Sequence, residues 1–203
     1  MTMMSLEMFH EQILKGKNPQ EVYELIEDFK IEMIFLKVQI EQKNILKLTL
    51  PPEDMVSKIK NYRFYIEDSY RYIESLNGEV NWAEEDAFTQ NFQKSIPFIE
   101  KIDYSENDKN LCEILFDEDS VRITQNKETV PSIDKEFFLN ALSELHMGEW
   151  REVYTANDYG LDSIEGLSWK IKVYFKNDMD TVLFTGTDAY PYNYKTFKQL
   201  IPE

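Results

Sequence analysis

Residues 169–176 read Trp-Lys-Ile-Lys-Val-Tyr-Phe-Lys, and their alternation sets the architecture that we expect for the second half of the chain. Apolar side chains alternate with three lysines and a tyrosine, which is the pattern of a β-strand with one buried and one solvated face. A turn at residues 177–180 and a second alternating run at residues 181–187 complete a hairpin. The sequence therefore predicts an antiparallel sheet with one face open to solvent.

The same period of two residues recurs upstream of this hairpin. Residues 98–104, 111–117 and 121–125 each alternate in the same way and predict three short strands. A further strand is expected at residues 149–154.

Three helices are expected among these strands. The first starts at Asn81 and runs to Ser95, the second covers residues 132–148, and the third closes the chain at residues 192–201. The middle helix should turn four apolar side chains inward, and these are Phe137, Phe138, Leu142 and Leu145.

The N-terminal part of the chain predicts helices alone. Asn18 as N-cap, followed by a proline and by Glu21 at the third helical position, is a start signal. An apolar stripe follows at spacings of three and four residues: Val22, Ile26, Phe29, Met33, Leu36 and Ile40. A second long helix is expected from Pro52 to Leu76, and the proline turn before it should fold the two helices back on each other.

The predicted fold class is therefore α+β, with an N-terminal hairpin of long helices followed by an antiparallel sheet with packed helices. We expect two domains, a helical hairpin at residues 1–78 and an α+β domain at residues 79–203. Because the apolar stripes also fit heptad spacing, a homodimer through the long helices stays open as an alternative to packing within one chain.

Charge is distributed unevenly between these parts. The chain carries a net charge of −16, and residues 79–165 supply most of it, with 21 acidic and 7 basic side chains. This balance argues against direct nucleic-acid binding, because phosphate contacts require an excess of Lys and Arg. A concentrated negative field instead attracts a basic protein partner, while an acidic surface that only maintains solubility is the competing interpretation.

The candidate partner-binding residues combine one aromatic side chain with exposed acids of the acidic segment 79–165. They are Trp82, Glu84, Glu85, Asp86, Asp117, Glu118 and Asp119.

No combination of residues predicts catalysis or a metal site. Cys112 lies in an expected strand, and neither His10 nor His146 has a second histidine at the spacing of a zinc site. We therefore expect no catalytic residue, no metal and no cofactor. The N-terminus lacks the basic and apolar regions of a signal peptide and no apolar run is long enough to span a membrane, so we expect a cytoplasmic protein without a membrane partner.

Four motifs near the C-terminus resemble a module of small uncharacterised bacterial proteins. They lie at residues 138–142, 145–150, 166–173 and 186–191. In that module a helix ending "LHIxEW" precedes a "DGTQWxLxIxF" strand, a hairpin, "GSNAYP" and a final helix; here Asp188 replaces the usual Asn, and Leu167 and Ser168 replace Thr-Gln. The resemblance covers about residues 137–201. It implies Gram-positive hosts and mobile or toxin-associated genes, and it carries no catalytic assignment.

Charge and resemblance together favour a non-enzymatic acidic module that binds proteins. The setting that fits both is an immunity or inhibitor protein that neutralises a basic toxin or nuclease. Two alternatives stay open: a phage-encoded inhibitor of a defence system that mimics nucleic acid with its carboxylates, and an enzyme of unrecognised type.

Overall fold

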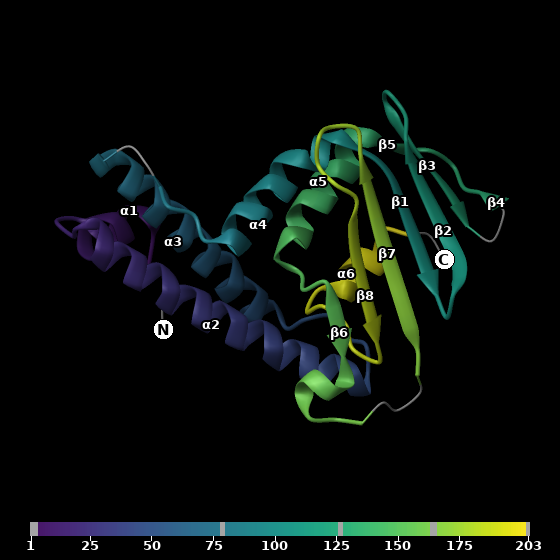
Figure 1. Cartoon of the computed structure of the whole chain (residues 1–203), viewed down its shortest axis with the longest axis horizontal. Coiled ribbons are helices and arrows are strands. Elements are labelled where there is room, and N and C mark those ends of the chain that lie inside the picture. Colours follow the sequence, from purple (N-terminus) through teal and green to yellow (C-terminus); the bar gives the residue numbers. More distant parts are fainter. Residues whose placement is uncertain (1–3, 78–79, 126–127, 163–165, 202–203) are drawn as a thin grey trace. The chain divides into compact units, whose positions relative to one another are not determined.

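The computed structural model describes residues 4–77, 80–125, 128–162 and 166–201 (Figure 1). The chain divides into two compact units. The first consists of Met1–Ile40 and Pro51–Trp82, and the second of Glu41–Leu50 and Ala83–Glu203. The domain border expected between residues 78 and 79 lies outside the described residues.

The first unit is helical. Its elements are α1 (Leu6–Phe9), the π-helical turn η1 (His10–Leu14), α2 (Pro19–Leu46), whose last turns belong to the second unit, and α3 (Glu53–Asn77). The start of α2 is the reciprocal cap expected from the sequence. The N–H of Asn18 donates to Oε2 of Glu21 at 2.8 Å, and the N–H of Glu21 donates to Oδ1 of Asn18 at 3.1 Å.

The long helices α2 and α3 pack against each other, which confirms the predicted hairpin. Apart from Phe29, the residues of the predicted stripe are buried: Val22, Ile26, Met33, Leu36 and Ile40. Phe29 is half-buried, and its ring lies 5.7 Å from that of Phe9 and 5.6 Å from that of Tyr65. Aromatic contacts of this kind extend the apolar stripe into a core for the first unit. Within the described ranges, no helix is both long and apolar enough to cross a membrane.

The second unit contains one sheet with helices. Its helical elements are α4 (Glu84–Ser95), η2 (Ile96–Phe98), α5 (Lys135–Leu145), η3 (Met147–Glu149), η4 (Ala156–Tyr159) and α6 (Tyr194–Gln199). Its strands are β1 (Ile99–Glu106), β2 (Lys109–Phe116), β3 (Ser120–Gln125), β4 (Glu128–Thr129), β5 (Ile133–Asp134), β6 (Val153–Thr155), β7 (Ser168–Phe175) and β8 (Val182–Thr187).

All eight strands belong to one sheet in the order β4-β3-β2-β1-β7-β8-β6, with β5 also paired to β3. Every neighbouring pair is antiparallel except β6 and β8, which are parallel. The α+β class with a mainly antiparallel sheet is therefore confirmed.

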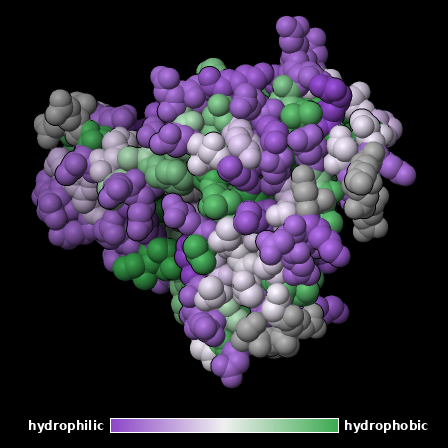
Figure 2. Space-filling model, turned by 45° about the vertical axis from the view of Figure 1, so that its right-hand side comes forward, coloured by the Kyte–Doolittle hydropathy of each residue, from purple (hydrophilic) through white to green (hydrophobic). Residues whose placement is uncertain are grey.

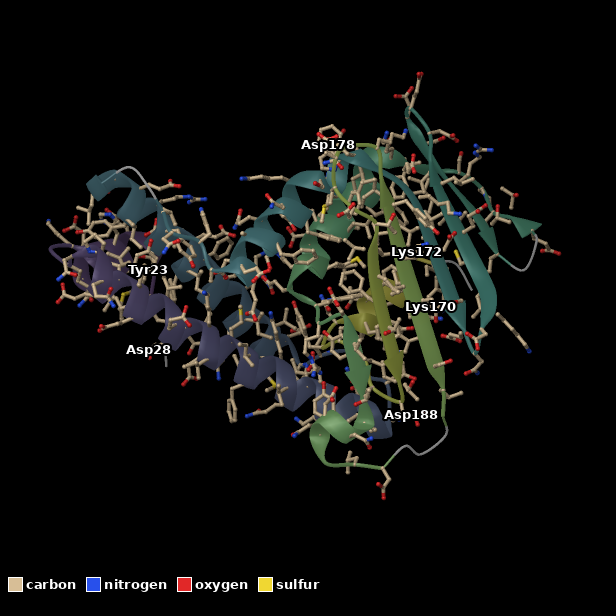
Figure 3. The ribbon with its side chains drawn as sticks, viewed as in Figure 1. Tyr23, Asp28, Lys170, Lys172, Asp178 and Asp188 are labelled. Atoms are coloured by element: carbon tan, nitrogen blue, oxygen red, sulfur yellow. The ribbon has the colours of Figure 1, made fainter. Side chains whose placement is uncertain are left out.

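One face of this sheet carries the core, and three helices cover it. From α4, Phe92 lies with its ring 6.1 Å from Phe184 of β8; from α5, Phe138 lies 5.7 Å from Phe116 of β2. From α6, Phe197 lies 6.1 Å from Tyr104 of β1. The register places these strand residues on a single face, because side chains two apart along a strand share a side. The opposite face is solvated, and Lys170 and Lys172 project from it (Figure 3).

The motif at residues 186–191 has a structural explanation. A Cβ atom on Gly186 would lie 2.4 Å from Nε1 of Trp169, so only glycine fits beneath this indole. The indole N–H donates to the carbonyl of Ala189 at 2.7 Å. Asp188 has a φ of +54°, and its carboxylate accepts the N–H groups of Gly166 and Leu167 at 2.8 and 2.9 Å. Since Asn and Asp both tolerate this conformation, the Asp at this position fits the motif.

Three local predictions were wrong. Phe137 is 66% exposed rather than inward-facing, because adjacent helical residues point about 100° apart and Phe138 occupies the core side. Helix α4 starts at Glu84 with Ala83 as N-cap, while the N–H of Asn81 donates to the hydroxyl of Tyr23. Only the end of the strand expected at residues 149–154 forms a strand, because η3 precedes it.

Candidate functional site

The first candidate residues lie on both sides of the border between the two units. Trp82 belongs to the first unit, where its ring centre lies 4.1 Å from that of Tyr70. Glu84, Glu85 and Asp86 form the first turn of α4, a position where the helix dipole favours acids. Glu84 and Glu85 are exposed, and within the described residues neither carboxylate makes a hydrogen bond or ion pair. These two charges are therefore available to a partner.

The second acidic set occupies the turn between β2 and β3. Asp117 accepts two hydrogen bonds from Arg122, at 2.6 and 3.0 Å, and hydrogen bonding from this guanidinium holds the pKa of Asp117 below its usual value. The Lys135 ammonium donates to the carbonyl oxygens of Asp117 and Glu118 at 2.8 and 3.3 Å. Asp117 thus has a structural role in the turn. The carboxylates of Glu118 and Asp119 are exposed and without a partner among the described residues.

The structure does not bring the two acidic sets together. Helix α4 is 12 residues long, or about 18 Å at 1.5 Å per residue. Its C-terminal end continues through η2 into β1, where Lys101 lies opposite Leu115 near the end of β2. The turn that follows β2 is therefore near the C-terminal end of α4, whereas Glu84 is at the N-terminal end. The seven predicted residues form separate acidic positions.

The residues that could carry nucleophilic or metal chemistry are in unrelated positions. Cys112 is buried in the sheet, and burial raises the pKa of its thiol to about 11. His146 has a φ of +48° and ends α5, while His10 belongs to the first unit and lies with its ring 5.4 Å from that of Tyr72. Asp178 and Asp188 lie at opposite ends of the β7–β8 hairpin (Figure 3). Across the described ranges, no three His, Cys, Asp or Glu side chains are grouped to hold a metal ion.

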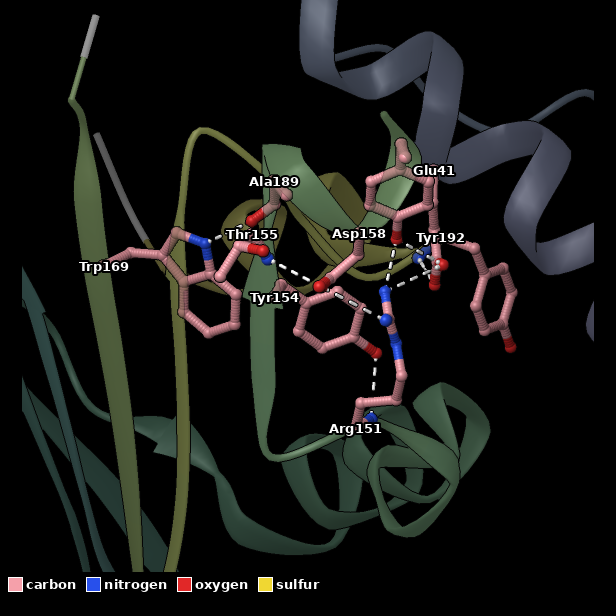
Figure 4. A network of polar contacts seen from close by, with 9 residues as sticks. Glu41, Arg151, Tyr154, Thr155, Asp158, Trp169, Ala189 and Tyr192 are labelled. Atoms are coloured by element: carbon pink, nitrogen blue, oxygen red, sulfur yellow. Dashed lines mark hydrogen bonds and ion pairs between the residues drawn. The ribbon is translucent and has the colours of Figure 1, made fainter. Parts of the chain in front are cut away.

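A polar network surrounds Glu41, whose side chain is only 5% exposed, in the part of α2 that belongs to the second unit (Figure 4). Its Oε2 accepts a hydrogen bond from the Tyr159 hydroxyl at 2.7 Å and lies 3.6 Å from the Arg151 guanidinium. Its Oε1 accepts the N–H of Tyr192 at 3.2 Å. The buried carboxylate is thereby compensated by a cation and two neutral donors, as a buried charge requires.

The same network holds both ends of β6. Before the strand, the N–H of Arg151 donates to the hydroxyl of Tyr154 at 3.0 Å, and the guanidinium lies 4.4 Å from the centre of the Tyr154 ring. After the strand, Thr155 and Asp158 cap η4 reciprocally, and Asp158 also pairs with Arg151 at 3.3 Å. Burial, reinforced by the Glu41 charge, raises the pKa values of Tyr154 and Tyr159 well above their usual value.

A groove lies between α4 and the edge of β8, with a volume of about 500 Å³. Phe88 and Asn91 of α4 line one side, and residues 179–183 line the other. Glu152 and Val153, at the junction into β6, also line it. The lining includes the apolar residues Phe88, Val153, Met179, Val182 and Leu183. Glu152 and Asp180 are exposed acids without a partner among the described residues.

Helical spacing in the sequence identifies one wall of this groove but not the groove itself. Glu84, Phe88 and Asn91 follow one another at spacings of four and three residues, which places them on one face of α4. The predicted residue Glu84 therefore lies one turn from the groove, along the same helix face. No protein-family model, no curated protein and no solved structure matches the chain.

Proposed function

We propose that this chain is a non-enzymatic protein-binding module that captures a basic protein partner through its acidic segment. The observation that supports this proposal is that the segment has exposed carboxylates without a partner among the described residues. They belong to Glu84, Glu85, Glu118 and Asp119. Hydrophilic residues cover much of the face shown in Figure 2, with hydrophobic ones between them. Exposed carboxylates without a partner speed the encounter with a basic surface, because their negative charge steers diffusion.

The setting that we propose is a cytoplasmic immunity or inhibitor protein that neutralises a basic toxin or nuclease. Such a protein covers the positive surface with which the toxin holds its own substrate. The resemblance of residues 137–201 to a module found beside toxin-associated genes supports this setting.

The test compares variants that each remove two charges. Two variants change the acidic segment: one combines Glu84→Gln with Glu85→Gln, and the other combines Glu118→Gln with Asp119→Asn. The matched control combines Glu53→Gln with Asp54→Asn, at the exposed start of α3. A basic protein captured from the host is passed over each immobilised variant at two salt concentrations. The first two variants should lower the association rate about threefold or more at low salt, because steering depends on local charge.

High salt should remove this difference, because the Debye length shortens from about 10 Å at 0.1 M to about 3 Å at 1 M. Association that is independent of salt and equal for all three variants would reduce the acidic segment to a solubilising surface.

A second proposal, a homodimer through the long helices, is favoured by one observation. Helix α2 exposes Ile31, Ile34 and Phe35 at 63%, 54% and 59%, and these residues lie on one side of the helix at spacings of three and four. Sedimentation of the free protein distinguishes it from the first proposal. An apolar seam keeps its dimer at high salt, and a monomer at all concentrations contradicts it.

A further inference from the structure

The edge of β8 is only partly covered. Its partner β6 lies opposite Thr185–Thr187, and the N–H of Thr185 donates to the carbonyl of Glu152 at 2.8 Å. The backbone groups of Thr185 thus point towards β6. Because successive residues of a strand point their backbone groups to opposite edges, the N–H and C=O groups of Val182, Phe184 and Gly186 point towards β7. The N–H and C=O groups of Leu183 therefore point to the outer edge of β8, and within the described residues nothing pairs with them.

The groove described above lies directly beside this unpaired backbone. Val182 and Leu183 line it together with Phe88 of α4 and Met179 of the turn before β8. One side of the groove thus offers a backbone donor and acceptor, and the other offers apolar surface. These are the two requirements for accepting an extended peptide, whose backbone bonds to the edge while alternate side chains enter a pocket.

The walls of the groove are held in place before any partner binds. The Asn177 side chain donates to the Ser95 hydroxyl at 2.9 Å, which ties the β7–β8 turn to the end of α4. At the other end, the network of Glu41 and Arg151 holds the start of β6. A preformed site avoids part of the entropic cost of ordering on binding.

We propose that an extended segment of the basic partner adds to the edge of β8 as a further strand, in the position that β6 leaves open. Its alternate apolar side chains enter the groove towards Phe88 and Met179, and its basic side chains lie near Glu152 and Asp180. This inference rests on the proposed function, since it assigns the mode in which the acidic module holds its partner.

Charge and geometry favour this occupant over others. Glu152 and Asp180 are exposed acids at the rim, and Glu84 lies one turn along α4 from Phe88, so a positively charged strand is attracted where an acidic one is repelled. The free edge of β8 is short, which limits the added strand to a few residues. A folded helix cannot use the Leu183 backbone, because its own N–H groups are already bonded.

The experiment uses the full chain and dye-labelled capped peptides. The probe alternates valine and lysine; one control peptide has the same sequence with N-methylated amides on its bonding edge, and another alternates valine and glutamate. Fluorescence anisotropy measures the affinity of each, and amide exchange of Leu183 reports the backbone bond. The first peptide should bind about tenfold more tightly than its N-methylated form, because methylation removes the donor to the Leu183 carbonyl and blocks addition as a strand.

Leu183→Pro removes the edge donor from the protein side. It should weaken the unmodified peptide about tenfold and leave the N-methylated one unchanged, because a peptide whose bonding edge is blocked by methyl groups cannot add as a strand and does not use the Leu183 N–H. Glu152→Gln with Asp180→Asn should weaken the lysine peptide about threefold, whereas the matched pair Glu53→Gln with Asp54→Asn, at the exposed start of α3, should not change its affinity.

Two outcomes would overturn strand addition. In the first, the N-methylated peptide binds as well as the unmodified one and the Leu183 amide exchanges at its free rate. In the second, the glutamate peptide binds as well as the lysine peptide. Both are distinguishable from failure of the proposed function, because the salt-dependent capture of the basic protein is measured separately and persists if only the binding mode is wrong.

Discussion

The two edges of the sheet are finished in different ways. At the β3 edge, β4 pairs with the last two residues and β5 with the first two, and between them the N–H of Val130 donates to the carbonyl of Ile123 at 2.9 Å. At the β8 edge, β6 covers only the last three residues. Open edges invite pairing with other chains, and proteins close those that serve no purpose. Under the proposed binding mode, the uncovered half of β8 is the part of the edge that the partner strand occupies.

The largest loss of unfolding free energy is expected in the half of β8 that β6 covers. Gly186→Ala places a methyl group against the Trp169 indole and the carbonyl of Ala189, and should lower the free energy of unfolding by about 3 kcal/mol. Gly160→Ala is the control, because its Cβ meets nothing although its φ is +71°, and should cost only about 1 kcal/mol. Urea unfolding measures both, and equal losses would contradict the close fit at Gly186.

Proline substitutions separate the two halves of β8 directly. Thr185→Pro deletes the bond to Glu152 and should cost about 2 kcal/mol, whereas Leu183→Pro deletes no bond and should cost less than about 1 kcal/mol. The difference in unfolding free energy between these two variants reports whether the Leu183 N–H is hydrogen-bonded in the folded protein. If Leu183→Pro is the more destabilising substitution, the Leu183 N–H is hydrogen-bonded in the folded protein and the edge at this residue is not free.

A smaller loss of stability is expected when the polar network around Glu41, which holds the start of β6, loses one hydroxyl group. Tyr159→Phe removes the hydroxyl that donates to the buried carboxylate of Glu41, at a cost of about 1–2 kcal/mol. Amide exchange at Tyr154 should accelerate by more than global unfolding explains, because the start of the strand loosens. Tyr174→Phe, a half-buried tyrosine on the open face, is the control, and an equal effect there would contradict a specific role of the network.

The smallest effect is confined to alkaline solution. Burial raises the pKa values of Tyr154 and Tyr159 above the usual value of 10.0. Above that value the unfolded chain loses phenolic protons that the folded chain keeps, so stability falls as pH rises, and is unaffected at neutral pH. Absorbance of tyrosinate followed with circular dichroism checks this. Ionisation of these residues should coincide with unfolding, and early titration of every tyrosine with the fold intact would disprove it.

Local patterns in the sequence predicted most elements of the fold. The alternation at residues 169–176 located β7 because one face of the sheet is buried and the other solvated. The pair Asn18 and Glu21 located the start of α2 because capping depends on neighbours in sequence. Phe137 could not be placed by the same means, since two adjacent aromatic residues compete for one inward direction.

The candidate site was less accessible to sequence analysis, for a physical reason. The acidic positions Glu84 and Glu118 were recognisable because charge is visible in composition. The groove was not, because it depends on which strands become neighbours. β6 pairs in parallel with β8 and starts at Val153. This placement depends on contacts such as that between Arg151 and Glu41, which are distant in sequence.

The seam between β1 and β7 has a consequence for the order of folding. Tyr104 lies opposite Ile171, so the centre of the sheet joins strands separated by about half of the second unit. A ribosome adding about 5–20 residues per second leaves β1 without this neighbour for roughly 10 s. During synthesis the three-stranded meander β1–β3 therefore has an unpaired edge at β1 until β7 is made. We expect chaperone binding to be strongest in that interval rather than in the mature protein.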